Sequence, residues 1–151
     1  MKLAEALAIR KDTQKKIEQL GTRLENNVKV QEGNEPAEDP SELMSQLDAC
    51  LDRLQKLIFL INKTNMHTLV EGKTLTELMA EKDALTLRVS ILHNVFKQAT
   101  ESLERYSRSE IKYVNTIDVR AVGKQIDTYS KQLRELEIKI QAANFSTELA
   151  D

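Results

Sequence analysis

The sequence predicts an all-α fold, an antiparallel up-and-down four-helix bundle or coiled coil, and leaves open a short two-stranded β ribbon at one end. Four Gly and two Pro in 151 residues are too few turn residues for a many-stranded sheet. Four segments also repeat apolar residues at alternating intervals of three and four, which is typical of amphipathic helices. We expect one helical domain over residues 1–151, with helices at about 2–27, 41–65, 75–107 and 118–143.

The first two helices differ in the strength of their apolar stripes. The stripe of residues 2–27 is weak because Arg10 and Thr13 interrupt it, and it consists of Leu3, Leu7, Ile17, Leu20 and Leu24. The helix over 41–65 begins after Asp39 and Pro40, an N-cap acceptor followed by proline at the first helical position. Its stripe is complete: Leu43, Leu47, Cys50, Leu54, Leu57 and Ile61, widened by Leu51 and Ile58.

The third and fourth helices keep the same spacing. Thr74 and Glu77 have the spacing of a capping box at the start of the third helix. Its stripe is Leu75, Leu78, Leu85, Val89, Leu92, Phe96, Ala99, Leu103 and Tyr106, with Lys82 as the charged member. Asp118 is the expected N-cap of the fourth, whose stripe is Val119, Val122, Ile126, Tyr129, Leu133, Leu136 and Ile140. Such spacing favours shallow crossing angles and a left-handed supercoil.

Two connectors carry contrasting charge. Residues 28–40 are acidic, whereas residues 107–117 are rich in tyrosine and basic residues. An up-and-down topology places both connectors at one end, where we expect their charges to pair within or between subunits. Both also contain β-branched residues in short alternating runs, at 28–31 and 111–117, and these runs are the expected site of the ribbon.

The composition argues against several partners. A formal net charge of −2 with interspersed signs gives no basic field for nucleic acid. The longest apolar run, Leu57–Ile61, is far shorter than the roughly 18 residues of a membrane span. Residues 1–12 are interrupted by Glu5 and do not follow the pattern of an export signal, so we expect a cytoplasmic protein. Cys50 lies on an apolar stripe and is expected to act as a small hydrophobic residue.

No motif for catalysis, metal binding or a cofactor stands out. Neither His67 nor His93 follows a Glu at the Glu-x-x-His spacing of di-metal bundles, and each is expected to be a solvated or capping imidazole. The run Glu71-Gly72-Lys73-Thr74 lacks the earlier glycine of a phosphate-binding loop, so Gly72 is expected to relieve a turn. We therefore expect no cofactor and no metal, and a non-enzymatic role is favoured over an enzymatic one.

Two polar clusters are the candidate ligand or interface sites. Asn62, Lys63, Thr64 and Asn65 are expected to cap the end of the second helix. The run from residue 106 to residue 114 is richer in function-bearing side chains than a turn requires, and a structural or intersubunit polar network is favoured over an anion or base site. The candidate residues are Arg105, Tyr106, Arg108, Glu110, Lys112, Tyr113, Asn62, Thr64 and Asn65.

Several blocks together resemble the septicolysin-like family of small bacterial proteins. These blocks are Lys29–Gly33, Glu35–Pro40, Asn62–Asn65, Thr74–Glu77, Tyr106–Val114 and Ala143–Phe145. The resemblance covers nearly the whole chain in order. It implies a largely uncharacterised protein, and the family name implies a cytolysin.

The leading functional hypothesis is a non-enzymatic, self-associating helical scaffold or interaction protein. The long, thin helices and the weak first stripe indicate a modestly stable monomer, so we expect a homo-oligomer. Two alternatives stay open. One is the membrane-active protein that the family name implies, although no 20-residue apolar hairpin exists. The other is an anion or nucleotide binder, or an enzyme, that uses the connector around residues 105–113.

Overall fold

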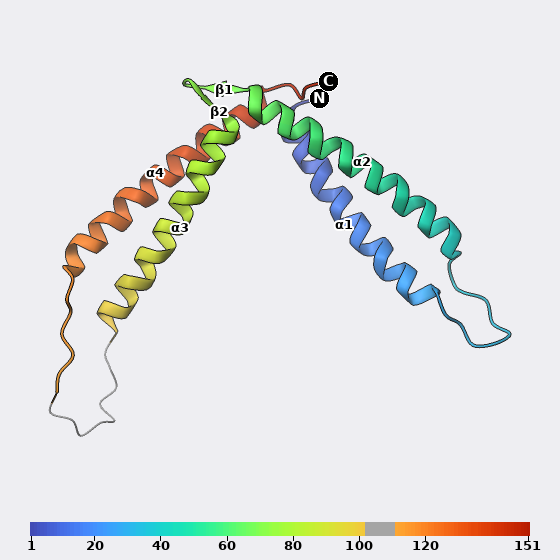
Figure 1. The fold of residues 1–151 in the computed structure, drawn as a ribbon, viewed down its shortest axis with the longest axis horizontal. Helices are drawn as coiled ribbons and strands as arrows, with labels where there is room; N and C mark the ends of the chain where they lie inside the picture. The colour runs from blue at the N-terminus through green and yellow to red at the C-terminus, as the bar shows by residue number, and fades with distance from the viewer. Residues whose placement is uncertain (102–110) are drawn as a thin grey trace. The chain divides into compact units, whose positions relative to one another are not determined.

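Four long helices form most of the chain, as predicted (Figure 1). The computed structural model describes residues 1–101 and 111–151. In chain order the elements are α1 Leu3–Asn27, α2 Pro40–His67, β1 Leu69–Val70, β2 Lys73–Thr74, α3 Leu75–Thr100 and α4 Val119–Ser146. The all-α fold class with an up-and-down order of helices is confirmed.

The chain divides into two compact units. The first consists of Met1–Thr76 with Gln141–Asp151, and the second of Glu77–Ile140. The first unit contains the α1–α2 hairpin and the β hairpin, and the second contains most of α3 and α4. The single helical domain over residues 1–151 stays a prediction.

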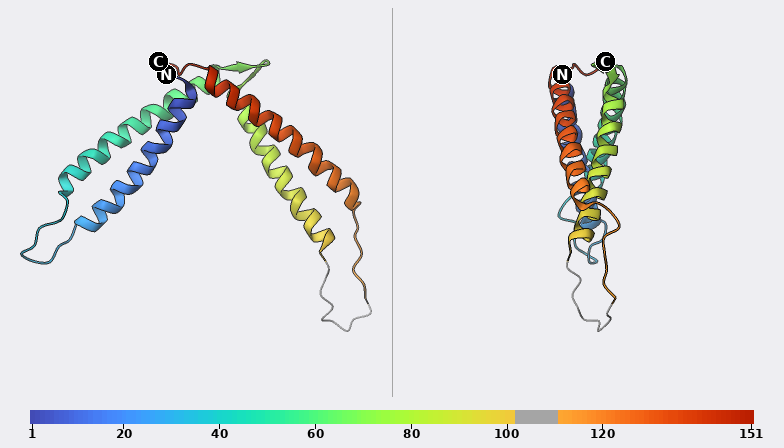
Figure 2. Two further views of the ribbon diagram at one scale, coloured as in Figure 1. Left: turned by 180° about the vertical axis from the view of Figure 1, so that it is seen from behind. Right: turned by 90° about the vertical axis from the view of Figure 1, so that its left-hand side faces the viewer.

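In the first unit, α1 and α2 run side by side in opposite directions (Figures 1 and 2). The Asp39 carboxylate accepts a hydrogen bond from the Ser41 backbone N–H at 3.0 Å, and Pro40 is the first residue of α2, as predicted. The apolar core of this unit comes from both helices, from the start of α3 and from the end of α4. Its buried members are Leu3, Ala6, Leu20, Leu43, Leu57, Ile61, Leu75 and Ala143.

The weak stripe of α1 contains polar residues that bond locally. Thr13 is buried, and its hydroxyl donates to the Ile9 carbonyl at 2.8 Å. The Asn27 amide nitrogen donates to the Arg23 carbonyl at 2.7 Å, and its oxygen accepts from the Glu38 N–H at 3.0 Å. Because buried polar groups are costly only when unpaired, these bonds allow the helix to keep polar residues in its seam.

The two chain ends lie side by side in the first unit (Figure 1). The Leu3 N–H donates to the Thr147 carbonyl at 2.9 Å, and the Leu149 N–H donates to the Met1 carbonyl at 2.8 Å. Lys2 forms an ion pair with Glu148. Thr147 and Leu149 therefore pair with the start of the chain, where Lys2 and Glu148 form an isolated antiparallel bridge.

The β ribbon exists, but its predicted location is wrong. The strands are β1 and β2, which pair Leu69 with Thr74 and Val70 with Lys73. Residues 28–31 and 111–117 form no strand. The turn explains the difference, since Glu71 and Gly72 both have positive φ angles of 50° and 84°, the geometry of a tight two-residue hairpin. The β-branched runs elsewhere have no such turn to pair them.

In the second unit, α3 and α4 pack along a narrow seam (Figure 2). Half-buried members of α3, including Lys82, follow the predicted stripe, while Ile126, Leu136 and Ile140 of α4 are buried. The two helices meet at Gly123, where a Cβ would make ordinary van der Waals contact with the Phe96 ring at 3.5 Å. The Asp118 carboxylate accepts from the Ala121 N–H at 3.2 Å and so caps α4, as predicted.

The third helix is shorter than predicted. It ends at Thr100, and Glu101 lies in a bend. The Asn115 side-chain amide donates to the Ala99 carbonyl at 3.0 Å, which satisfies one of the acceptors at a helix C-terminus. The rest of the predicted helix, to residue 107, falls on residues outside the described part of the chain.

Candidate interaction surfaces

The predicted polar cluster at residues 62–65 does not end the second helix. Helix α2 continues to His67, and Thr68 is its C-cap. Asn62 is exposed, whereas Thr64 and Asn65 are buried. The cluster therefore does not present three polar side chains to a common ligand.

Thr64 instead ties α2 to the C-terminal segment. Its side chain is only 3% exposed, its hydroxyl donates to the Leu60 carbonyl at 2.7 Å, and the same oxygen accepts from the Ala150 N–H at 2.9 Å. Beside it, the Lys63 ammonium donates to the Asp151 backbone carbonyl at 2.9 Å. Because the Thr64 hydroxyl both donates and accepts a hydrogen bond, it links α2 to the C-terminal segment.

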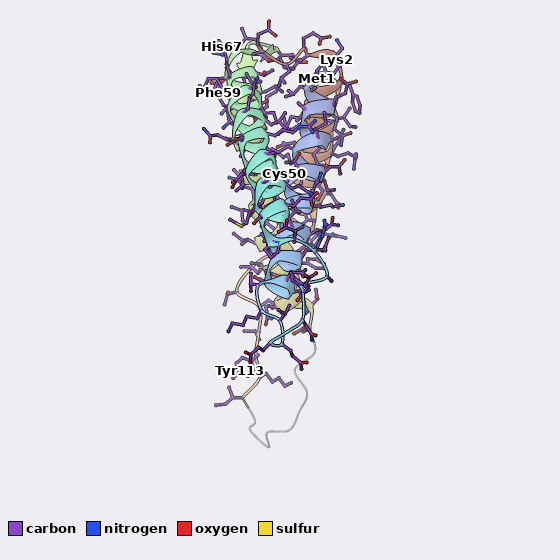
Figure 3. All side chains as sticks on the ribbon, turned by 90° about the vertical axis from the view of Figure 1, so that its right-hand side faces the viewer. Met1, Lys2, Cys50, Phe59, His67 and Tyr113 are labelled. Carbon is purple, nitrogen blue, oxygen red and sulfur yellow. The ribbon has the colours of Figure 1, made fainter. Side chains whose placement is uncertain are left out.

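The predicted connector site lies mostly outside the described residues. The site residues that lie outside the described part of the chain are Arg105, Tyr106, Arg108 and Glu110. Lys112 and Tyr113 are described and exposed, and the Tyr113 side chain is 86% exposed on the connector before α4 (Figure 3). An anion or nucleotide site at residues 105–113 therefore stays a prediction.

The two imidazoles and the thiol occupy unremarkable positions. His67 and His93 are both exposed, and His67 Nδ1 lies 2.8 Å from the Lys63 carbonyl in the last turn of α2. Cys50 is half-buried on the seam side of α2. Within residues 1–101 and 111–151, no group of three or more His, Cys, Asp or Glu side chains gathers as metal ligands do.

One strong ion pair joins the acidic connector to its own hairpin. The Arg23 guanidinium donates from Nε to Glu38 Oε2 at 3.0 Å, and its Nη2 also contacts Glu38 Oε1. These hydrogen bonds hold the pKa of Glu38 below its ordinary value. Glu38 thus has a partner on α1 of its own hairpin. The two connectors belong to different units, and charge pairing between them stays a prediction.

Helix α2 carries an apolar outer face. Leu51 and Ile58 were expected to widen the core stripe, but both are exposed. The α2 outer face consists of Met44, Leu51, Ile58, Phe59 and Met66. Phe59 lines a shallow hollow with Asp52, Gln55 and Lys56, and it is labelled on α2 in Figure 3.

Helix α3 carries a second apolar stripe that the sequence analysis missed. Beside its half-buried seam, it repeats residues at alternating intervals of four and three on another side. This α3 outer face consists of Ala80, Ala84, Leu87, Ile91, Asn94 and Gln98, all exposed. Leu87 and Ile91 at its centre are 64% and 60% exposed. The signal was present in the spacing, but assigning each helix a single stripe concealed it.

Comparison with known proteins defines the family. A family model described as "Family of unknown function (DUF6847)" matches residues 10–149. The chain belongs to this family. Its fold is similar to that of a solved structure titled as a functionally unknown conserved protein from Corynebacterium diphtheriae, with 41% sequence identity, a TM-score of 0.93 and 99% of each chain covered. No curated protein matches the sequence.

These matches correct the resemblance drawn from the sequence. The similarity to the septicolysin-like family is wrong, since the matching family model is DUF6847 and the matching structure carries no such name. The blocks that carried the resemblance are short, and blocks of this length recur by chance in unrelated helical proteins. The cytolysin hypothesis therefore loses its basis. Among the described helices, none combines the length and apolar character needed to cross a bilayer.

Proposed function

We propose that the protein is a non-enzymatic helical protein that associates with copies of itself and serves as a scaffold or interaction protein. The supporting observation is the α3 outer face, where Leu87 and Ile91 expose most of their side chains. Burying a leucine or isoleucine completely is worth about 1.5–3 kcal/mol. Two such residues on successive turns of a heptad pattern favour contact with another helix.

The pattern of α3 strengthens the proposal. A helix that faces one neighbour needs one apolar stripe, and the seam toward α4 already supplies it. Helix α3 has a second stripe on another side, including Ala84, Leu87 and Ile91. Helices with two stripes are typical of assemblies in which one helix contacts two others.

Sedimentation velocity across a roughly hundredfold range of protein concentration tests the proposal, because self-association depends on concentration. We expect the sedimentation coefficient to rise with concentration toward that of a dimer or larger oligomer. Repeating the series at high salt shows whether charges contribute to the contact. A monomer at every concentration would contradict the proposal.

The cytoplasmic location and the absence of nucleic-acid binding stay predictions.

A further inference from the structure

The α3 outer face is nearly symmetric about its own midpoint. Position 89 lies midway between Leu87 and Ile91, between Ala84 and Asn94, and between Ala80 and Gln98. A helix laid antiparallel across this face, with a twofold axis near position 89, would therefore set Leu87 of one copy against Ile91 of the other, twice. Self-matching of this kind is what a twofold-symmetric contact requires.

The layers on either side of the centre also match in size. In the same arrangement each Ala84 faces Asn94 of the second copy, and each Ala80 faces Gln98. Small residues opposite longer ones keep two helix axes at an even separation. The amide side chains lie at the two ends of the contact, where water reaches them and satisfies their hydrogen bonds.

Charge follows the same symmetry. Asp83 and Lys97 lie 14 positions apart, which is two heptads, so both flank the same edge of the stripe. Their midpoint is residue 90, so an antiparallel copy brings each Asp83 beside Lys97 of the other. Both side chains are exposed, and the Lys97 ammonium lies 3.7 Å from the Glu101 carboxylate, a long contact for an ion pair.

A parallel arrangement of the two α3 helices would make a less favourable charge pair. It would set Asp83 beside Arg88 of the second copy, since these positions are five apart across a parallel seam. The Arg88 guanidinium, however, already lies over the Tyr129 ring of its own hairpin, 4.7 Å from the ring centroid. Among the described residues Lys97 has only its contact with Glu101, so its pairing with Asp83 favours the antiparallel arrangement.

On the basis of the self-association proposed above, we infer that the partner of the α3 outer face is the same face of a second copy, packed antiparallel with Leu87 against Ile91 and Asp83 beside Lys97. The face spans residues 80–98, about 27 Å of helix. A contact of this length is small for a stable dimer. The dimer should therefore dissociate on dilution.

The first test is substitution within the face. Leu87→Gln removes both central leucines of the dimer, and we expect the dissociation constant to rise at least tenfold in sedimentation equilibrium. Ile138→Gln is the matched control, since Ile138 is on α4 of the same unit and is 61% exposed. It should leave association unchanged. Circular dichroism verifies that both variants fold.

The second test is a charge exchange. Lys97→Asp places two acidic side chains together at each end of the antiparallel contact, and we expect about fivefold weaker association. The double variant with Asp83→Lys and Lys97→Asp restores opposite charges and should return to wild-type affinity. In the parallel arrangement Lys97 has no role, so Lys97→Asp would associate like wild type.

The outcomes separate this inference from the proposed function. A wild-type chain that is monomeric throughout overturns both. Concentration-dependent association that Leu87→Gln leaves intact overturns the α3 contact but not self-association. Association weakened by Leu87→Gln but unaffected by Lys97→Asp overturns the antiparallel register.

Discussion

At the scale of single residues, the buried polar side chains serve as links rather than as a chemical site. Thr64 and Asn27 are both buried and both bond to backbone groups of other segments, the C-terminal stretch and the acidic connector. The sequence predicted that residues 62–65 cap the end of the second helix. It could not show that Thr64 meets Ala150, because that contact joins positions 86 residues apart.

Removing the Thr64 hydroxyl should loosen the C-terminal segment. Thr64→Val keeps the shape but leaves the Ala150 N–H without its acceptor, so we expect a loss of about 1–2 kcal/mol in the free energy of unfolding. Hydrogen exchange should also accelerate at Ala150. Thr86→Val is the matched control, because the exposed Thr86 hydroxyl bonds only to the Lys82 carbonyl of its own helix. Equal melting temperatures for the two variants would contradict the link.

The Arg23–Glu38 pair gives a prediction about pH. Hydrogen bonds from Arg23 lower the pKa of Glu38 from the ordinary value of 4.5. The pair's contribution to stability is therefore complete above that value and is lost as the pH falls through the lower pKa of the folded state. In an NMR titration the Glu38 carboxyl should titrate below ordinary glutamate, and Arg23→Gln should raise its midpoint. An unchanged midpoint in Arg23→Gln would show that the pair does not persist in solution.

At the scale of elements, sequence patterns predicted what depends on neighbours in the chain. The caps at Asp39 and Asp118 were predicted because the acceptor and the donor are three residues apart or fewer. The predicted location of the ribbon was wrong because it relied on runs of β-branched residues and not on the turn that joins the strands. In fact Glu71-Gly72 decides the hairpin, and Gly72 was expected only to relieve a turn.

Two glycines should respond to alanine in opposite directions. Gly72 has a φ of 84°, which alanine adopts only with strain, so Gly72→Ala should lower the free energy of unfolding by about 1 kcal/mol. Gly21 lies inside α1 with open space where a Cβ would stand, so Gly21→Ala should raise it by about 0.5–1 kcal/mol. Urea denaturation measures both. A stabilising Gly72→Ala would show that the turn is not formed as described.

At the scale of the whole molecule, the fold class followed from the sequence but the family did not. Heptad spacing is a physical consequence of helix packing and was read directly. Family membership depends on the detailed sequence over residues 10–149. The family predicted from the sequence was wrong because it relied on a few short polar blocks. The second stripe of α3 was equally readable, yet only the structure shows that the α3–α4 hairpin leaves Leu87 and Ile91 exposed.

Cross-linking at residue 90 tests the central claim, pairing of two copies through α3, most directly. In a chain with Cys50→Ser, Ser90→Cys would lie beside its own symmetry mate at the twofold axis. We expect a short bis-maleimide to convert this variant to covalent dimer at concentrations where the wild type associates. Thr86→Cys, exposed on α3 but outside the outer face, should form no covalent dimer. Equal cross-linking at the two positions, or none at residue 90, would contradict the account.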